Sequence, residues 1–196
     1  IFLLRNFILL ALLPALLARI ASKKFSRYRV AMPLLLYSIF IALFFATGSL
    51  NNSFDLPEAV VKRKNDFALL EKGRTDLPMR TLEPTTGSFI KNMPQAFNHG
   101  LLRPYPFEFN IGSTLASLEI YFYLLVFLLF LLTEKKITRY PIHPFNIFGL
   151  AFSITMIFII GFTIPNAGAI IRYRSIIWIF LLSPVVCRIF DRYQLK

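Results

Sequence analysis

The sequence predicts an all-α polytopic membrane protein with about five transmembrane helices and one long extracytoplasmic segment. The chain is 56% hydrophobic with a mean hydropathy of +0.61, above the roughly 45–50% apolar share of soluble domains. Its apolar residues form long blocks, close to the roughly 20 residues that cross a bilayer core. Because lipid offers the backbone no hydrogen-bond partner, such continuous runs must be helices, and their pattern excludes the alternating strands of a barrel.

Five apolar blocks approach this length and divide the chain. They are expected at residues 1–19, 30–49, 115–133, 145–164 and 169–190. The expected domains are a transmembrane hairpin over 1–49, an extracytoplasmic segment over 50–114, and three further spans with a cytoplasmic tail over 115–196. Because the chain begins at Ile1 with neither an initiator Met nor a polar leader, and its first span is expected to enter from outside, we expect it to be the C-terminal part of a longer chain. The lack of a basic n-region and of a cleavage site favours a retained helix over a signal peptide at residues 1–19.

The distribution of positive charge predicts the orientation of these spans. The formal net charge is +12, yet residues 50–115 carry eight Lys/Arg against seven Asp/Glu. The excess lies in the connections 20–29 and 134–144 and after the last span. Since cytoplasmic loops are enriched in Lys and Arg, we expect these regions and the C-terminus in the cytoplasm, and the N-terminus of this segment outside. We therefore interpret the basic clusters as signals of membrane topology, with a specific anionic-lipid site as the alternative, and we expect no nucleic-acid partner.

The extracytoplasmic segment divides into two parts. Its first part is expected to be solvated, with one helix from about Pro57 to Glu71 that ends at Gly73. In the second part, apolar residues recur at helical spacing between polar ones, which predicts an amphipathic helix over 87–102 lying at the outer membrane surface, with Phe89, Met93 and Phe97 toward the acyl chains. Such a helix is either the rim of a lipid-facing cavity or an interfacial anchor without a ligand.

Two arginines one residue apart, Arg172 and Arg174, lie at the outer end of the last span. If residues 168–176 are helical, these side chains point about 200° apart, whereas an extended backbone would direct both the same way as a clamp for phosphate oxygens. Three interpretations remain open. The arginines reach lipid phosphates, bind the diphosphate of a lipid-linked substrate, or form a structural pair with Glu119 or Glu108.

The candidate catalytic residues are Glu119 and His99. Glu119 lies in the first turns of the third span, after an expected helix cap at Ser113 or Thr114, and is expected to face protein with an arginine as its partner. As a general base it would need a raised pKa and a nearby acceptor hydroxyl. His99 could transfer protons, although its place on the polar face of a surface helix favours a solvated side chain.

Motifs of soluble cofactor chemistry are missing from the sequence. It has no Cys/His ligand spacing, no Gly-rich phosphate loop after a strand and no G-x-S-x-G elbow. We therefore expect neither a metal nor another cofactor. The second histidine, His143, lies between two prolines in an expected cytoplasmic turn, where a structural role is expected.

Two stretches carry a family resemblance. "SFIKNMPQAFNHGLLRPYPFEF" followed by "LASLE", together with "PNAGAIIRYRS", resembles uncharacterised multispanning proteins of bacterial envelope-polysaccharide pathways, and more loosely lipid-linked glycan polymerases, ligases and C-type glycosyltransferases. The match covers residues 83–119 and 164–176, around a quarter of the chain. It implies a bacterial inner-membrane protein that handles a polyprenyl-linked glycan. It transfers no catalytic residue, and the acidic outer-loop motif of many C-type transferases is not in this sequence.

The sequence is compatible with three functions. The first is an enzyme that transfers or polymerises lipid-linked glycan at the outer face, with Arg103, Arg172 and Arg174 binding the substrate phosphate. The second is a non-catalytic membrane subunit that docks a membrane-protein partner through its outer segment. The third is a transporter or lipid flippase, which is disfavoured because the spans lack charges at mid-membrane and paired broken helices.

Overall fold

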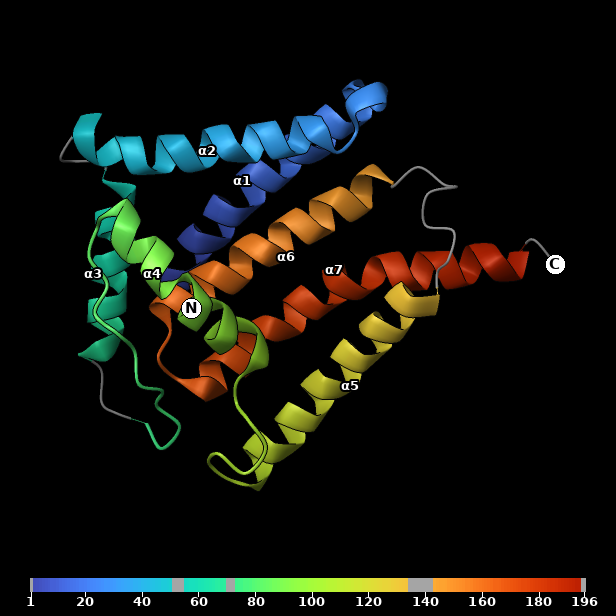
Figure 1. Ribbon diagram of the computed structural model, residues 1–196. Coiled ribbons are helices and arrows are strands. Elements are labelled where there is room, and N and C mark those ends of the chain that lie inside the picture. Colours follow the sequence, from blue (N-terminus) through green and yellow to red (C-terminus); the bar gives the residue numbers. More distant parts are fainter. Residues whose placement is uncertain (1, 51–54, 70–72, 134–142, 195–196) are drawn as a thin grey trace.

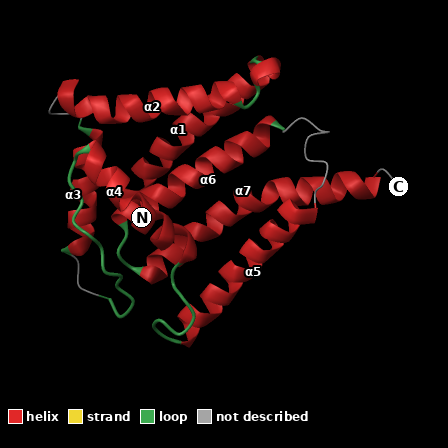
Figure 2. Cartoon of the chain, viewed as in Figure 1, coloured by secondary structure: helices red, strands yellow, loops and turns green. Residues whose placement is uncertain are grey.

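The described residues form a helical bundle, shown in Figures 1 and 2. The structure is a computed structural model and describes residues 2–50, 55–69, 73–133 and 143–194. Its long helices are α1 (Phe2–Lys24), α2 (Ala31–Leu50), α5 (Ile111–Thr133), α6 (Pro144–Thr163) and α7 (Ala167–Gln194). Helices α2, α5, α6 and α7 are long and apolar enough to cross a membrane. The predicted all-α polytopic membrane class is therefore confirmed, whereas α1 as a fifth span stays a prediction.

Polar side chains determine where three of the long helices begin. Asn110 accepts the backbone N–H of Ser113 at 2.8 Å, so α5 starts one turn earlier than the cap expected at Ser113. Asn166 accepts the N–H of Ala169 at 3.1 Å and caps α7. His143 accepts a backbone N–H from the first turn of α6, which gives it the structural role expected of it. Each side chain satisfies a donor that a helix start leaves unpaired.

Helix α6 forms the centre of the bundle. It packs against α1, α7 and the helices of the outer segment. Half of its apolar span is buried inside the protein, compared with 17% for α5 and 6% for α2. Because apolar side chains need cover from water, the remaining surfaces of α2 and α5 face membrane lipid.

Residues 50–114, expected to be extracytoplasmic and called the outer segment, form helices at one end of the bundle in their described part. These are α3 (Leu56–Ala68), α4 (Thr86–Phe97) and a π-helical turn, η3 (Asn98–Leu102). Figure 1 shows α3 and α4 together at one end, while the α1–α2 connection, the start of α6 and the C-terminal end of α7 lie at the other. The expected helix from Pro57 ends earlier than predicted, at Ala68, and the expected 87–102 helix is continued by η3 in its last turn.

Two glycines bring the backbone of the outer segment directly onto α6. A Cβ atom at Gly161 of α6 would collide with the carbonyl of Ala96 in α4, and a Cβ atom at Gly100 of η3 would collide with the carbonyl of Ile157 in α6. On α6 the contact positions are Ile157 and Gly161, and on the facing helix they are Ala96 and Gly100. Both pairs are four positions apart, so the two contacts lie one helical turn apart. Small residues at this spacing permit close helix contact in membranes.

A second contact ties the outer loop to the α6–α7 turn. The N–H of Leu77 donates to the carbonyl of Pro165 at 2.6 Å, and the N–H of Ala167 donates to the carbonyl of Thr75 at 2.9 Å. The side chain of Asn166 adds a hydrogen bond to Asp76 at 3.1 Å. These bonds satisfy backbone groups that a loop without regular structure would otherwise leave unpaired.

We predict that Gly161→Ala destabilises the fold by about 1–3 kcal/mol, because the added methyl group must push α4 off α6. The control is Gly87→Ala in α4, where a Cβ meets open space and the helix gains propensity. Thermal unfolding of the purified protein in detergent, followed by circular dichroism, measures both. Equal melting temperatures for the two variants would show that the close backbone contact between α4 and α6 contributes nothing to stability.

Candidate functional site

Helix α4 separates two different surfaces. Its start is capped by Thr85, whose hydroxyl accepts the N–H of Ser88 at 3.3 Å. From this cap, one side of the helix exposes apolar residues, with Ile90 61% and Met93 44% exposed. The opposite side carries polar residues, and Asn92 is buried there. The predicted amphipathic character is therefore confirmed, because the same helix carries an apolar surface and a polar surface.

The apolar side of α4 faces an open groove of about 640 Å³. Helices α2, α4 and α6 form its walls. The side chains that define its shape are Ala42, Phe45, Ile90, Met93, Phe158 and Phe162. Phe89 closes its inner wall by edge contacts with the rings of Phe45 and Phe162, at centroid distances of 5.5 and 5.1 Å. This volume lies within the roughly 300–1,000 Å³ of small-molecule sites.

Polar atoms are few in the groove and lie at its two ends. At one end, the hydroxyls of Tyr37 and Thr155, both partly buried, hydrogen-bond each other across 3.2 Å. At the outer end, Thr86 belongs to the first turn of α4. The apolar stretch between these ends would suit an unbranched or isoprenoid chain, which has no polar atoms to satisfy.

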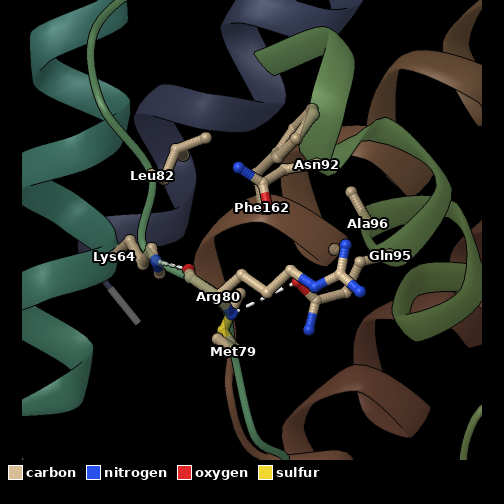
Figure 3. A pocket seen from close by; sticks show the side chains of 9 residues that line it. Lys64, Met79, Arg80, Leu82, Asn92, Gln95, Ala96 and Phe162 are labelled. Atoms are coloured by element: carbon tan, nitrogen blue, oxygen red, sulfur yellow. Dashed lines mark hydrogen bonds between the residues drawn. The ribbon is translucent and has the colours of Figure 1, made fainter. Parts of the chain in front are cut away.

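On the polar side, the extended segment around Arg80 is held between α3 and α4 (Figure 3). The Arg80 N–H donates to Gln95 Oε1 at 3.2 Å, and Gln95 Nε2 donates to the carbonyl of Pro78 at 3.0 Å. The ammonium of Lys64, a buried residue of α3, donates to the Arg80 carbonyl. Burial lowers the pKa of Lys64. Backbone groups of this segment are thus satisfied, and the Arg80 side chain remains exposed.

Arg80 borders two polar hollows. An open basin of about 740 Å³ lies at the start of α4 and includes Lys91, Thr85 and Glu83. A smaller cavity of about 280 Å³ lies toward η3 and is lined by Asn98, His99 and Arg103 in addition to Gln95. The basin and the apolar groove come closest at the start of α4, where Thr85 lines the basin and its sequence neighbour Thr86 lines the groove.

His99 is buried, with only 2% of its surface exposed, so the expectation of a solvated histidine is wrong. The π-helical turn of η3 directs it inward, where its Nε2 lies 3.5 Å from Nη1 of Arg103. Burial and the neighbouring Arg103 charge lower the pKa of His99 to about 4. His99 is therefore neutral at physiological pH and, because arginine can only donate, its Nε2 is an acceptor.

Arg103 belongs to a compact polar cluster. Its Nη2 pairs with Glu108 Oε1 at 3.4 Å. Glu108 also accepts the backbone N–H of Tyr105 at 2.9 Å, and the Tyr105 hydroxyl donates to Asn98 Oδ1 at 2.7 Å. The segment after η3 is therefore fixed by side chains of its own sequence, and Arg103 remains at the cavity wall.

Arg174 is turned into the protein and is 2% exposed. Its Nη1 donates to the carbonyls of Leu101 at 2.9 Å and Arg103 at 2.6 Å. These carbonyls lie at the C-terminal end of η3, where a helix leaves acceptors unpaired and favours a positive charge. Arg172 is exposed on the same helix, so the structure has the helical arrangement in which the two arginines diverge.

Glu119 does not face protein as expected, because its side chain is exposed on α5. The Tyr123 hydroxyl, one turn further along, donates to Glu119 Oε1 at 2.9 Å. The carboxylate attracts Arg174 electrostatically, yet the hydrogen bonds described for Arg174 go to backbone carbonyls. Helix α5 packs mainly against α7, which leaves the Glu119 position uncovered.

Several site residues were missed by sequence reasoning. Lys64 and Arg80 lie in the first part of segment 50–114, which is expected to be solvated, and Gln95 is one of the polar residues of the expected amphipathic helix. The sequence pattern around these residues gives little sign of their role, because each of them is held by a hydrogen bond to or from a backbone group distant in the sequence. Over the described part of the chain, no group of three or more His, Cys, Asp or Glu side chains is arranged to hold a metal ion.

Comparison with known proteins adds no assignment. No family model matches the chain, and neither a curated protein nor a solved structure is significantly similar to it.

We predict that Arg174→Lys lowers the free energy of unfolding by about 1–3 kcal/mol, since one ammonium cannot reproduce the two charge-assisted hydrogen bonds to η3. Arg172→Lys is the matched control and should change stability by less than about 0.5 kcal/mol, because Arg172 is exposed. Thermal unfolding measures both. A fully stable Arg174→Lys protein would contradict a structural role for this arginine.

We also predict a loss of stability in acid caused by His99. Its pKa is about 4 in the folded protein and about 6.5 when unfolded, so the unfolded chain binds the proton more readily. The contribution of neutral His99 is complete above about pH 6.5 and is lost as the pH falls through about 4. Melting temperatures of the wild type and His99→Gln, compared between pH 7.5 and 4, should converge in acid. Parallel curves would refute this.

Proposed function

We propose that this chain is part of an integral membrane protein of bacterial envelope glycan assembly, which handles a polyprenyl-phosphate- or polyprenyl-diphosphate-linked sugar at the outer face of the inner membrane. The observation that carries the proposal is the apolar groove of about 640 Å³ that opens beside the basic basin at the start of α4. A ligand that fills both needs a long apolar chain joined to an anionic head.

The apolar part of this ligand occupies the groove. The groove runs between α2 and α6 from the first turn of α4 to the Tyr37–Thr155 hydroxyl pair. Because α2 is only 6% buried along its span, the groove lies beside lipid, and a chain can enter sideways from the bilayer. A polyprenyl chain makes contact through dispersion and exclusion of lipid, and it needs no polar partner along the groove.

The anionic head lies in the basin. Lys91 and Arg80 border the basin, and their charges exceed that of Glu83 by one. The amide groups at the start of α4 point toward this end of the helix, where the helix dipole favours negative charge. A phosphate attached to a chain in the groove would therefore meet two cations at the helix start.

The arginines expected to bind the substrate phosphate have different roles in this proposal. Arg103 borders the polar cavity and can meet a head group there, whereas Arg172 is exposed but lines neither the basin nor the cavity. Arg174 acts indirectly, because it holds the backbone from Leu101 to Arg103 in position. Glu119 and His99 stay candidates for proton transfer in a transferase, and lipid binding requires neither.

The proposed orientation follows from the charge distribution. The end of the bundle that carries α3 and α4 is the extracytoplasmic end, and the basic α1–α2 connection lies at the cytoplasmic end. This orientation puts the basin at the outer membrane surface, where a polyprenyl-linked sugar presents its phosphate after it has crossed the bilayer.

We predict that Ala42→Trp weakens binding of a long-chain polyprenyl phosphate about tenfold or more. The indole fills the groove, and a loss of about 60 Å² of apolar contact costs about 1.5 kcal/mol. Leu43→Trp is the control, because the neighbouring side chain is exposed on α2 outside the groove. Native mass spectrometry of detergent-purified protein measures both. Equal binding by the two variants, or equal preference for a diacyl phosphatidate, would contradict the proposal.

A further inference from the structure

The cavity of about 280 Å³ beside η3 is separate from the apolar groove. It lies on the polar side of α4, and its wall includes Arg80, Gln95, Asn98, His99 and Arg103. We propose that this cavity binds a phosphate-type oxyanion, held by the guanidinium groups of Arg80 and Arg103 and by the Asn98 amide. The oxyanion is either a lipid head group or free phosphate. The inference does not require the proposed function, because it needs no lipid chain.

The charge of the cavity favours an anion. Its described lining contains two arginines and no carboxylate. Glu108, which is not part of this lining, pairs with Arg103 at 3.4 Å, so the Arg80 charge remains in excess. The described bonds at Arg80 use its backbone N–H and carbonyl, so they hold the residue in place without occupying its guanidinium. A guanidinium group presents paired donors that match two oxygens of a phosphate.

Two buried donors near the cavity lack an acceptor. The His99 side chain is only 2% exposed, and its Nδ1 has no hydrogen-bond partner among the described residues. Because Nε2 faces the Arg103 donor, Nδ1 carries the proton of the neutral ring. Nε of Arg103 is also buried without a partner. Both atoms are covered by protein, so an anion in the cavity would stabilise them through its negative charge, without a direct hydrogen bond.

The remaining lining suits an oxyanion as well. Asn98 Oδ1 is used by the Tyr105 hydroxyl at 2.7 Å, which directs the Nδ2 donor of the same amide away from that bond. Gln95 is already engaged at both ends and acts as a fixed wall. At roughly 30 Å³ per water, the cavity has room for a phosphate group with several waters or with part of an attached sugar.

The histidine at the cavity wall provides the reporter for a test. The chain contains two histidines, so the ring signals of His99 are readily resolved by nitrogen-15 NMR, and His143→Asn, which keeps a capping side chain, assigns them. The protein is placed in nanodiscs of zwitterionic lipid and titrated with inorganic phosphate. We expect a saturable shift of the His99 signals. The absence of a saturable shift, here and with a lipid phosphate, overturns the proposal and leaves water as the occupant.

Asn98→Asp is the decisive variant. It keeps the acceptor for Tyr105 but adds a negative charge to the cavity, so the dissociation constant for phosphate should rise at least about tenfold. Asn65→Asp makes the same charge change on the exposed surface of α3 and should leave the constant within about twofold. Equal weakening by both variants would show general surface attraction and overturn the site. If Asn98→Asp does not fold, Arg80→Gln replaces it with the same expectation.

A second arm identifies the source of the oxyanion. Nanodiscs that contain phosphatidic acid, with no free phosphate, should shift the His99 signals if a lipid head group reaches the cavity. A shift with inorganic phosphate alone assigns the site to a soluble anion. A shift with either the lipid or free phosphate supports the proposal, provided that Asn98→Asp abolishes it. Ala42→Trp, which fills the groove, should leave the His99 shift with inorganic phosphate intact. The experiment therefore distinguishes failure of the proposed lipid binding in the groove from failure of the proposed anion binding in the cavity.

Discussion

The arrangement of the outer segment depends on the close contact between its backbone and α6. Gly161 lets the carbonyl of Ala96 approach α6, and Gly100 lets η3 approach the carbonyl of Ile157 one turn away. With side chains at both glycines, α4 would lie further from the bundle. The groove, whose walls are α2, α4 and α6, and the cavity beside η3 both take their dimensions from this distance.

The same contact explains why a charged side chain can be buried at the start of α7. Once η3 rests on α6, its last carbonyls point toward α7, and Arg174 satisfies those of Leu101 and Arg103. Burial of an arginine inside a membrane protein is costly unless its donors find acceptors, and the end of a π-helical turn supplies them without a carboxylate. Arg174 and η3 therefore stabilise each other, and neither arrangement would persist alone.

Much of the fold could be predicted because it depends on local patterns. Block length and hydropathy locate the long helices, including α6, which begins at Pro144, one residue before the expected span. The site was harder to predict because its contacts join residues far apart in the sequence. Arg174 acts on carbonyls more than 70 positions earlier, and His99 is buried because a π-helical turn rotates it inward, which helical spacing alone cannot show.

Helix α4 adjoins the groove, the basin and the cavity. Its first turn lies between the groove and the basin, and the cavity lies along its polar side, with Arg80 bordering both polar hollows. In the proposed function, a head group attached to a chain in the groove would lie near Arg80, which also borders the cavity that Arg103 lines. Lys64 and Arg174 hold backbone carbonyls beside these hollows, whereas the Arg80 side chain is exposed. Cations that stabilise the backbone and an exposed cation that can meet a ligand are therefore two parts of one arrangement.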